Sequence, residues 1–417
     1  MKAKAVLLYG KGDLRTETIE LPEMKDDELL CEVVTDSLCM STYKEMLQGG
    51  DHRCVPDDVA DHPIIVGHEF CARVLRVGAR WTERFREGER IAVQPKMYID
   101  GVLKAPGYSY PYYGGDATAI VVPGEAIGRG YVLPYRSSAC YRASMGEPIS
   151  CLVAAIRAHY HLASDRRTHV MGLKDGGSLA IVAGCGPMGL GAAQVAMALE
   201  PRPRRIVLTD IDESRVARAR KLLKGRNGVE VIVLNTRDCD AAAALLEANG
   251  SRGYDDAIIM APVPEVIETA DAALGEDGCL NFFAGPTKRD FTARVNFYDV
   301  HYNFRHVIGT SGGELDDMID ALKLIETGAI DPSNLISHIG GLDAAAEATR
   351  ALPNLPGGKK LIYCNLRLPL TAIEDFGELG KSDPLFRELH EIVAKNAMLW
   401  CEEAEKLLLA RGRRIAP

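Results

Sequence analysis

The stretch SLAIVAGCGPMG, residues 178–189, decides the fold of this chain. It starts as a continuous apolar run of strand type and passes directly into a turn in which Gly184, Gly186 and Gly189 have the spacing GxGxxG. Glycines at these places permit a tight turn, let the backbone approach a pyrophosphate, and let the following helix pack on the strand. The small side chains of the next residues, up to Leu199, suit such a helix. The sequence therefore predicts a dinucleotide site at this strand–turn–helix junction.

The residues around this turn complete the predicted site. The helix that begins at Pro187 and Met188 offers N–H groups and a positive dipole end to the phosphates. Asp210 ends the next strand, where a carboxylate accepts hydrogen bonds from ribose hydroxyls and disfavours a 2′-phosphate, so NAD is favoured. Arg215 lies five residues on and offsets part of that repulsion, which leaves NADP open. The structural alternative is that Asp210 caps the helix beginning near Asp212.

Two patterns divide the 417 residues, a length that indicates two domains. Short β-type runs broken by Gly and Pro fill residues 1–150, which favours a strongly bent antiparallel domain. Strands alternate with helices from about 178 to 310, as in a parallel sheet covered by helices. We expect an α/β protein with a catalytic domain at 1–155, joined by 306–417, and a doubly wound Rossmann domain at 156–305.

Two further helices are expected from apolar periodicity. Residues 151–164 carry apolar positions on one helical face and predict a helix that joins the domains. Residues 384–412 are amphipathic, with charged residues on one side, and predict a helix for packing or subunit contact.

Composition and charge narrow the classes of function. The net charge of −9, without a long run of Lys and Arg, argues against nucleic acid as the main partner. The sequence has no stretch of transmembrane length, so no membrane partner is expected. Its 11 cysteines are scattered and lack a CxxC pair, which favours reduced thiols and a cytoplasmic location.

A second constellation lies ahead of the dinucleotide site. It consists of Cys39 in DSLCMST, His68 and Glu69 in GHEF, and Glu147 in GEPIS. Alone, the cysteine would be a small buried hydrophobe and the histidine a core residue. Together, a thiolate, an imidazole and carboxylates suit zinc with an open position for water or substrate. A Lewis acid and a hydride carrier on one chain point to alcohol–ketone redox chemistry.

The GHE motif with an upstream cysteine, followed by a dinucleotide fold, resembles the zinc-containing medium-chain dehydrogenase/reductase family along nearly the whole chain. The resemblance implies a GroES-like first domain and a catalytic zinc held by Cys39 and His68. It makes Glu69 the adjacent carboxylate that can exchange into the metal shell. Glu147 matches the third-ligand position of the polyol-dehydrogenase branch, and Cys151, four residues on, is the alternative ligand.

The resemblance also implies a proton relay. Ser41 matches the hydroxyl that exchanges a proton with the substrate oxygen, and Lys44 stands where many relatives have a histidine. Lys44 could equally be a solvated surface lysine. Thr42 stands where an Asp usually supports the metal site, so another carboxylate is expected to substitute. Residues 94–128 contain no cysteine, which implies one zinc per chain and no structural zinc.

The stretches CLNFFAGP and FYDVHYNFRHVIGTSGG resemble family members that act on ketose phosphates. This implies interconversion of L-sorbose 1-phosphate and D-glucitol 6-phosphate, and a homodimer or homotetramer. A phosphate needs cationic donors, and the candidates are Arg142, Lys44, Arg305 and His306. Two alternatives stay open: a sorbitol- or threonine-type dehydrogenase acting on an unphosphorylated substrate, and a catalytically inactive NAD(P)H-binding protein.

Overall fold

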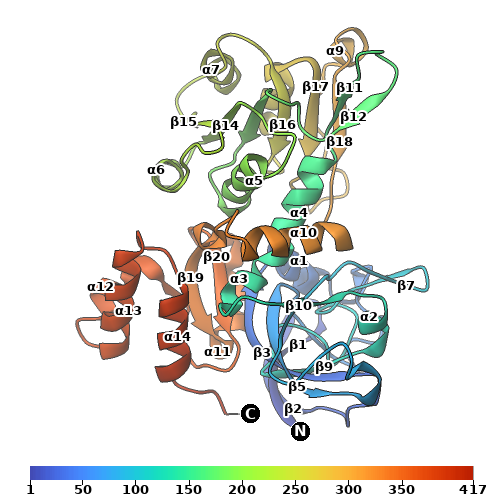
Figure 1. The fold of residues 1–417 in the computed structure, drawn as a ribbon, viewed down its shortest axis with the longest axis vertical. Coiled ribbons are helices and arrows are strands. Elements are labelled where there is room, and N and C mark those ends of the chain that lie inside the picture. Colours follow the sequence, from blue (N-terminus) through green and yellow to red (C-terminus); the bar gives the residue numbers. More distant parts are fainter. Residues whose placement is uncertain (417) are drawn as a thin grey trace. The chain divides into compact units, whose positions relative to one another are not determined.

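The computed structural model describes residues 1–416, which form two compact units (Figure 1). Unit 1 consists of Met1–Glu147 and the residues from Ile336 on, and unit 2 is Pro148–Leu335. The chain therefore leaves the first unit once and returns to it.

Unit 2 is built on a parallel sheet of six strands in the order β15-β14-β13-β16-β17-β18. Its strands are β13 (Ser178–Val182), β14 (Arg205–Asp210), β15 (Glu230–Asn235), β16 (Tyr254–Ile259), β17 (Leu274–Phe282) and β18 (His306–Gly309). Every neighbouring pair is parallel, and the order reverses beside β13. This is the doubly wound arrangement predicted from residues 178–189, and it is confirmed.

Helices connect these strands, and a small hairpin precedes them. The helices are α4 (Gly146–Arg157), α5 (Pro187–Ala198), α6 (Glu213–Leu222), α7 (Ala241–Ala248), α8 (Pro264–Ala273), α9 (Phe297–Tyr302) and α10 (Leu315–Glu326). The hairpin consists of β11 (Tyr160–Leu162) and β12 (His169–Met171). The expected helix over 151–164 is therefore wrong at its end, because Tyr160–Leu162 pairs as a strand after α4 ends at Arg157.

The boundaries of the units differ from those expected at 155/156 and 305/306. The chain returns to unit 1 at Ile336, because β18 extends the six-stranded sheet and keeps the residues that follow with unit 2. The first change of unit comes after Glu147, near the start of α4.

Unit 1 holds a bent, mainly antiparallel sheet of eight strands in the order β10-β6-β5-β3-β20-β19-β21, with β9 also paired to β3. Its strands are β3 (Leu29–Leu38), β5 (Phe70–Val77), β6 (Arg90–Val93), β9 (Ala119–Val122), β10 (Val132–Tyr135), β19 (Ile336–Gly341), β20 (Lys359–Tyr363) and β21 (Thr371–Ala372). Smaller sheets contain β1 (Lys2–Gly10), β2 (Asp13–Glu20), β4 (Ile64–Ile65), β7 (Met97–Ile99) and β8 (Val102–Lys104). The predicted antiparallel character of this unit is confirmed.

The helices of unit 1 are α1 (Met40–Gln48), α2 (Gly124–Gly128), α3 (Cys140–Ser144), α11 (Leu342–Ala351), α12 (Phe376–Leu379), α13 (Pro384–Lys395) and α14 (Glu402–Arg411). Short 3-10 turns lie at Gly49–Asp51, Ala79–Trp81, Leu352–Asn354 and Ile373–Asp375, with a further one in unit 2 at Pro332–Leu335. The single helix expected over 384–412 is wrong: Ala397 and Met398 adopt positive φ angles, which end α13 and redirect the chain into α14.

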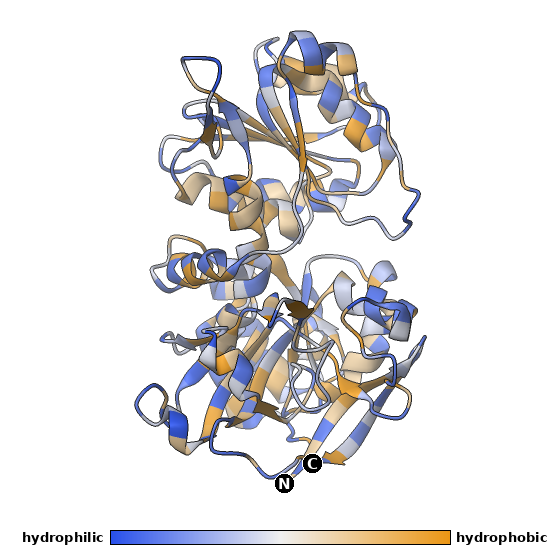
Figure 2. Cartoon of the chain, turned by 90° about the vertical axis from the view of Figure 1, so that its right-hand side faces the viewer, coloured by the Kyte–Doolittle hydropathy of each residue, from blue (hydrophilic) through white to orange (hydrophobic). Residues whose placement is uncertain are grey.

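Each unit has its own apolar core. In unit 2 the strands are almost wholly apolar at their centres, because helices cover the sheet (Figure 2). In unit 1 the core joins strands of all three sheets with α1, α2 and α11. No helix among residues 1–416 combines the length and the apolar character needed to cross a membrane.

Candidate functional site

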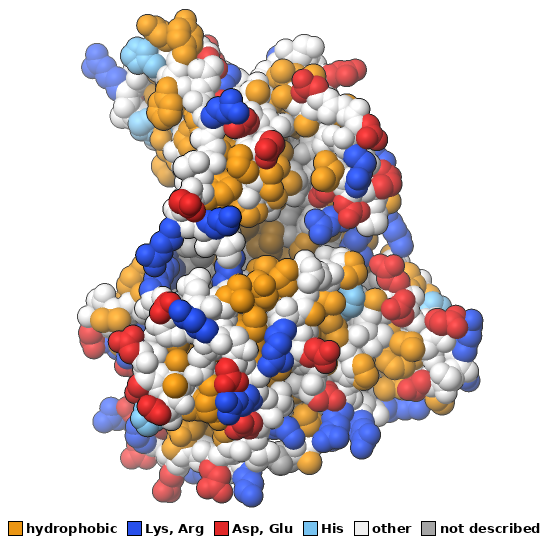
Figure 3. Space-filling model, turned by 180° about the vertical axis from the view of Figure 1, so that it is seen from behind, with side chains coloured by type: hydrophobic (Ala, Val, Ile, Leu, Met, Phe, Trp, Pro, Cys, Tyr) orange, Lys and Arg blue, Asp and Glu red, His pale blue; other side chains and the backbone are white. Residues whose placement is uncertain are grey.

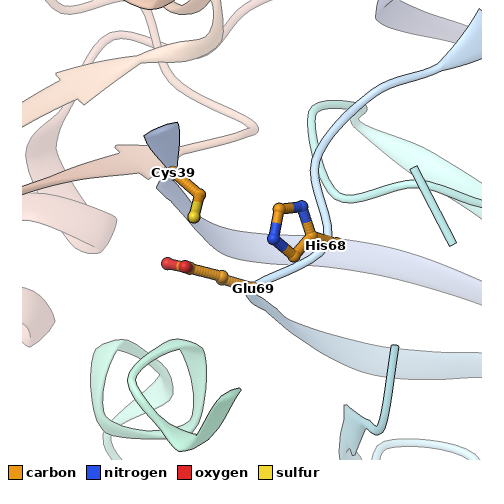
Figure 4. A group of neighbouring side chains, drawn as sticks. All are labelled: Cys39, His68 and Glu69. Atoms are coloured by element: carbon orange, nitrogen blue, oxygen red, sulfur yellow. The ribbon is translucent and has the colours of Figure 1, made fainter. Parts of the chain in front are cut away.

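Three side chains of the predicted metal constellation converge in unit 1. Cys39, His68 and Glu69 each offer a ligand atom, and these atoms lie within 4.8 Å of one another. The three side chains point toward a common centre from the start of α1 and from the loop between β4 and β5 (Figure 4). A thiolate, an imidazole and a carboxylate at this spacing suit a tetrahedral zinc ion.

The sheet brings these distant residues together. Cys39 follows β3 and caps the N-terminus of α1. The N–H of Glu69 donates to Asp36 Oδ1 at 3.0 Å, and the N–H of Ser37 donates to the Glu69 carbonyl at 3.1 Å, so the GHE segment is fixed against the end of β3. Gly67 is required there: its φ is +93°, and a Cβ would lie 2.2 Å from Asp36 Oδ2.

A hydroxyl supports His68 where the family pattern usually has a carboxylate. Thr42 is buried, and its Oγ1 lies 3.4 Å from His68 Nδ1. A partner on Nδ1 fixes the ring and leaves Nε2 for a metal. A substitute carboxylate was expected for this position. The contact found on the Nδ1 side of the ring is with Thr42 itself.

Lys359, at the start of β20, was missed in the sequence. Its Nζ lies 2.6 Å from both carboxylate oxygens of Glu69, and both side chains are buried. The Lys359 ammonium helps to hold the pKa of Glu69 below its usual range, against the opposing effect of burial, and Glu69 in turn raises the pKa of Lys359. Lys359 stands 290 positions from Glu69 and belongs to none of the motifs that predict the metal site.

Glu147 lies outside the three-residue group but acts on it. Burial raises the pKa of the Cys39 thiol to about 12, and the negative charges of Glu69 and Glu147 contribute to that rise. Cys39 Sγ also lies 3.5 Å from both the amide nitrogen and the hydroxyl oxygen of Ser41. A thiol and two carboxyl groups therefore lie close together, and a bound dication would favour their charged forms. Cys151 is one turn further along α4, in unit 2.

Tyr108 is a second residue of the site that stands in none of the metal-ligand motifs. It belongs to the stretch KAPGYSYPYYGGDAT, residues 104–118, which we call the tyrosine-rich lobe and which lies within the cysteine-free residues 94–128. Its ring packs against His68 with 5.2 Å between ring centroids. Burial raises its pKa, the charges of Cys39 and Glu147 contribute, and a hydrogen bond with the Ser41 side chain opposes the rise. The phenol therefore lies beside the metal donors and the expected relay hydroxyl.

The glycine-rich turn in unit 2 has the geometry of a phosphate cradle. A Cβ on Gly189 would lie 1.9 Å from the carbonyl oxygen of Gly184, and a Cβ on Gly184 would lie 2.5 Å from Ile181 Cγ2. Both positions therefore exclude a side chain. Gly186 caps α5, which starts at Pro187, and a Cβ there would meet open space, where a ligand can approach the backbone.

Asp210 ends β14 beside this turn. Its Oδ1 accepts the N–H groups of Ile211 and Asp212 at 2.9 and 3.1 Å, and its Oδ2 accepts from Cys185 at 3.3 Å. The helix cap is a different residue: Asp212 accepts the N–H groups of Ser214 and Arg215 at the start of α6. The alternative that Asp210 serves as the cap of this helix is therefore wrong. The side chain of Arg215 is exposed.

The four candidate phosphate contacts fall in different places. In unit 2, Arg305 donates to the carbonyls of Asp271, Leu274 and Gly275 and pairs with Asp299 at 3.0 Å. His306 Nε2 lies 2.9 Å from Asp277 Oδ1. Arg142 stacks on Tyr141 and donates to its hydroxyl at 3.1 Å.

Lys44 is the candidate beside the metal donors. It lies on α1, one turn after Ser41, and is partly buried. Burial lowers the pKa of Lys44, and the Cys39 thiol opposes that change. Of the four candidates, Lys44 is thus the one that interacts electrostatically with an expected metal ligand, Cys39.

Comparison with known proteins covers both units. The family model of the alcohol dehydrogenase GroES-like domain matches residues 25–154, and that of the zinc-binding dehydrogenase matches residues 187–327. The chain is similar in fold to the crystal structure of 2R,3R-butanediol dehydrogenase from Bacillus subtilis, with a TM-score of 0.71 and 23% identity over 87% of this chain and 100% of that chain.

Two named relatives are similar along nearly their whole length. Mannitol-1-phosphate 5-dehydrogenase of Aliivibrio fischeri is 44% identical over 97% of this chain and 97% of its own. L-sorbose 1-phosphate reductase of Klebsiella pneumoniae is 42% identical over 99% of this chain and 98% of its own. Solved structures of the same fold include proteins bound to NADP and to NADH.

Proposed function

The chain belongs to the zinc-dependent medium-chain dehydrogenase/reductase family and is an oxidoreductase, and we propose that it interconverts L-sorbose 1-phosphate and D-glucitol 6-phosphate. The observation that carries the chemistry is the convergence of Cys39, His68 and Glu69 within 4.8 Å. The near full-length similarity to L-sorbose 1-phosphate reductase supports the substrate.

The donor set fits one zinc ion per chain. Cys39, His68 and Glu147 would hold it, and Glu69 would be an exchangeable carboxylate, which Lys359 holds through both oxygens at 2.6 Å. When bound, the metal supplies a Lewis acid that polarises the substrate carbonyl. The cysteine-free stretch 94–128 supports the absence of a structural zinc.

Protein side chains fix the orientation of His68 and exchange a proton with the substrate. Ser41 lies beside Cys39 and hydrogen-bonds with Tyr108, so its hydroxyl donates a proton to the substrate oxygen during reduction and accepts one during oxidation. Lys44, one turn on, continues the relay toward solvent. Thr42 fixes the His68 ring through Nδ1.

A nicotinamide dinucleotide is the hydride carrier. The cradle of Gly184, Gly186 and Gly189 and the α5 N-terminus at Pro187 and Met188 would hold its pyrophosphate. Asp210 would accept the ribose hydroxyls, which favours NAD over NADP. The exposed Arg215 on the next helix is the group that would admit NADP.

A second substrate is favoured by a specific observation. Mannitol-1-phosphate 5-dehydrogenase is 44% identical to this chain. In that substrate the oxidised carbon lies far from the phosphate, whereas in L-sorbose 1-phosphate the carbonyl is adjacent to the phosphate-bearing carbon. The two candidates therefore require different distances between the metal and the phosphate site.

The deciding assay measures kcat/KM of the zinc-loaded protein with each cofactor on L-sorbose 1-phosphate, D-fructose 6-phosphate and unphosphorylated L-sorbose. The proposal expects the highest value on L-sorbose 1-phosphate. Equal values on L-sorbose with and without phosphate would instead favour a sorbitol-type enzyme. An inactive NAD(P)H-binding protein would turn over none of them and would be unaffected by Cys39→Ser.

A homodimer or homotetramer remains part of the proposal, but the C-terminal helices give it little support. The apolar face of α13 packs within unit 1, where the ring centroids of Phe386 and Phe376 are 5.4 Å apart. Exposed aromatic residues instead gather on α9, at one end of unit 2 (Figure 3): Phe297, Tyr298 and Tyr302.

A further inference from the structure

The loop after α1, residues 51–62, carries an imidazole, His52, and a guanidinium, Arg53, that the proposed function has not used. Its apolar residues Val55 and Val59 are buried, whereas Arg53 is exposed and His52 partly buried. The loop is tied to the tyrosine-rich lobe, because Ser109 Oγ donates to the Cys54 carbonyl at 2.8 Å. The loop therefore has a fixed position beside the lobe.

A stack of three rings connects this loop to the metal donors. Tyr108 packs on His68 with 5.2 Å between centroids and on His52 with 5.0 Å, the second pair nearly parallel at 27°. His52 is thus separated from a metal ligand by a single aromatic ring.

His52 is oriented to donate a hydrogen bond away from its own loop. The N–H of Cys54 donates to His52 Nδ1 at 3.3 Å, so Nδ1 is an acceptor and the proton resides on Nε2. Burial lowers the pKa of His52, and the charges of Arg53 and His68 lower it further. Near neutral pH the ring is a neutral N–H donor.

One cationic side chain, that of Arg53, lies next to this donor, and another, that of Lys44, lies beside the metal donors. Arg53 is close enough for its charge to act on both His52 and Cys54. Lys44 is partly buried on α1, one turn after Ser41, and interacts electrostatically with Cys39. Acidic residues also lie near this group: Asp51 pairs with Lys11, Asp58 faces His62 at 3.9 Å, and Asp57 and Asp61 stand exposed in the same loop. Burial raises the pKa of Glu45, which lies beside Tyr108 and Cys54.

We propose that Lys44, His52 and Arg53 form the subsite that binds the phosphate group of the substrate, with Tyr108 as the wall between this subsite and the metal. A guanidinium, an ammonium and an imidazole N–H match the oxygens and charge of a phosphate monoester. The inference rests on the proposed function and specifies its substrate class. It also replaces Arg305 and His306, whose polar atoms are engaged within unit 2.

The first test measures phosphate binding itself. Inorganic phosphate is titrated into the zinc-loaded protein by calorimetry, using the wild type, Arg53→Gln, His52→Gln and the control Arg86→Gln, which alters another exposed arginine of unit 1. Loss of a charge-assisted contact should weaken phosphate binding about tenfold or more in the first two variants but not in the control. No measurable binding by the wild type, or equal affinity in all four proteins, would overturn the subsite.

The second test separates the subsite from the proposed function. The ratio of kcat/KM on L-sorbose 1-phosphate to that on L-sorbose should fall about tenfold or more in Arg53→Gln and His52→Gln, mainly through KM. A wild-type ratio near one would refute the proposed substrate, whereas the phosphate titration decides on the subsite alone. A high wild-type ratio that both variants retain would contradict the subsite and leave the substrate standing.

Discussion

The buried pair of Lys359 and Glu69 makes the substitution Lys359→Met a sharp test of the metal-site geometry. The two side chains are 9% and 1% exposed, and one ammonium serves both carboxylate oxygens at 2.6 Å. Methionine fills similar space but removes the charge, which leaves a buried carboxylate without its partner. Breaking a buried pair in this way costs about 3–5 kcal/mol.

The loss of stability caused by Lys359→Met should depend on whether zinc is bound. In the chelated protein Glu69 has lost its buried counter-charge, so the free energy of unfolding should fall by the full amount. In the zinc-loaded protein the dication at Cys39 and His68 offers Glu69 a new partner, and the loss should be smaller. The assay is urea unfolding of wild type and variant, with zinc and with a chelator.

Lys360→Met is the matched control. Lys360 is also buried, but its Nζ contacts the carbonyls of Pro356 and Gly358. Its loss of stability should therefore be the same with and without zinc. Equal losses for Lys359→Met in the two conditions, or a loss under about 1 kcal/mol in the chelated protein, would refute the reasoning.

The pH dependence of the effect has a definite sign. Lys359 helps to lower the pKa of Glu69 below the ordinary 4.5, so this pair stabilises the fold above that pH. Its contribution is lost as the pH falls through the lowered value. The difference between wild type and Lys359→Met should therefore narrow toward acid pH.

Three further substitutions have distinct outcomes. Glu147→Gln should lower the zinc content measured by metal analysis and turnover at least tenfold, and Cys151→Ser should not, if Glu147 is the third ligand. Asp210→Ser should raise the kcat/KM ratio of NADPH to NADH at least tenfold, and an unchanged ratio would contradict its ribose role. Burial raises the pKa of Glu405 to about 7, so its contribution to stability is present below pH 4.5 and is lost as the pH rises through 7. The free energy of unfolding measured in urea should therefore decrease from pH 5 to pH 8, and Glu405→Gln should make this decrease smaller. An unchanged pH dependence in the variant would refute this role of Glu405.

The parts of the fold with a local signal were predictable. The run at 178–189 combines a buried strand, a turn that only glycine tolerates and a helix start, and the structure has all three. The break between Lys395 and Glu402 was not predictable from periodicity, because the apolar spacing continues through two residues with positive φ. The backbone conformation of two residues ends α13, although the pattern of apolar side chains predicts that the helix continues.

The site was predictable only where a motif kept its members adjacent. His68 and Glu69 stand in one motif, and Cys39 in another that precedes a helix. Lys359 is 290 positions from Glu69, and its contact depends on β20 pairing with β3. Pairing of strands so distant in sequence leaves no periodic signal at the lysine itself, so its role emerged only from the structure.

The tyrosine-rich lobe connects these observations. Gly107 lies so close to Gly67 that a Cβ on Gly107 would be 2.3 Å from the carbonyl oxygen of Gly67. The N–H of Gly107 donates to the carbonyl oxygen of Tyr113. Tyr113 in turn packs edge-on against Phe70, directly after the GHE motif, at 6.0 Å. The lobe is thus held by the same segment that presents two of the expected metal ligands. Because these contacts also fix Tyr108 on His68, the aromatic residues that stand in the cysteine-free stretch both anchor the lobe and shape the site beside the metal.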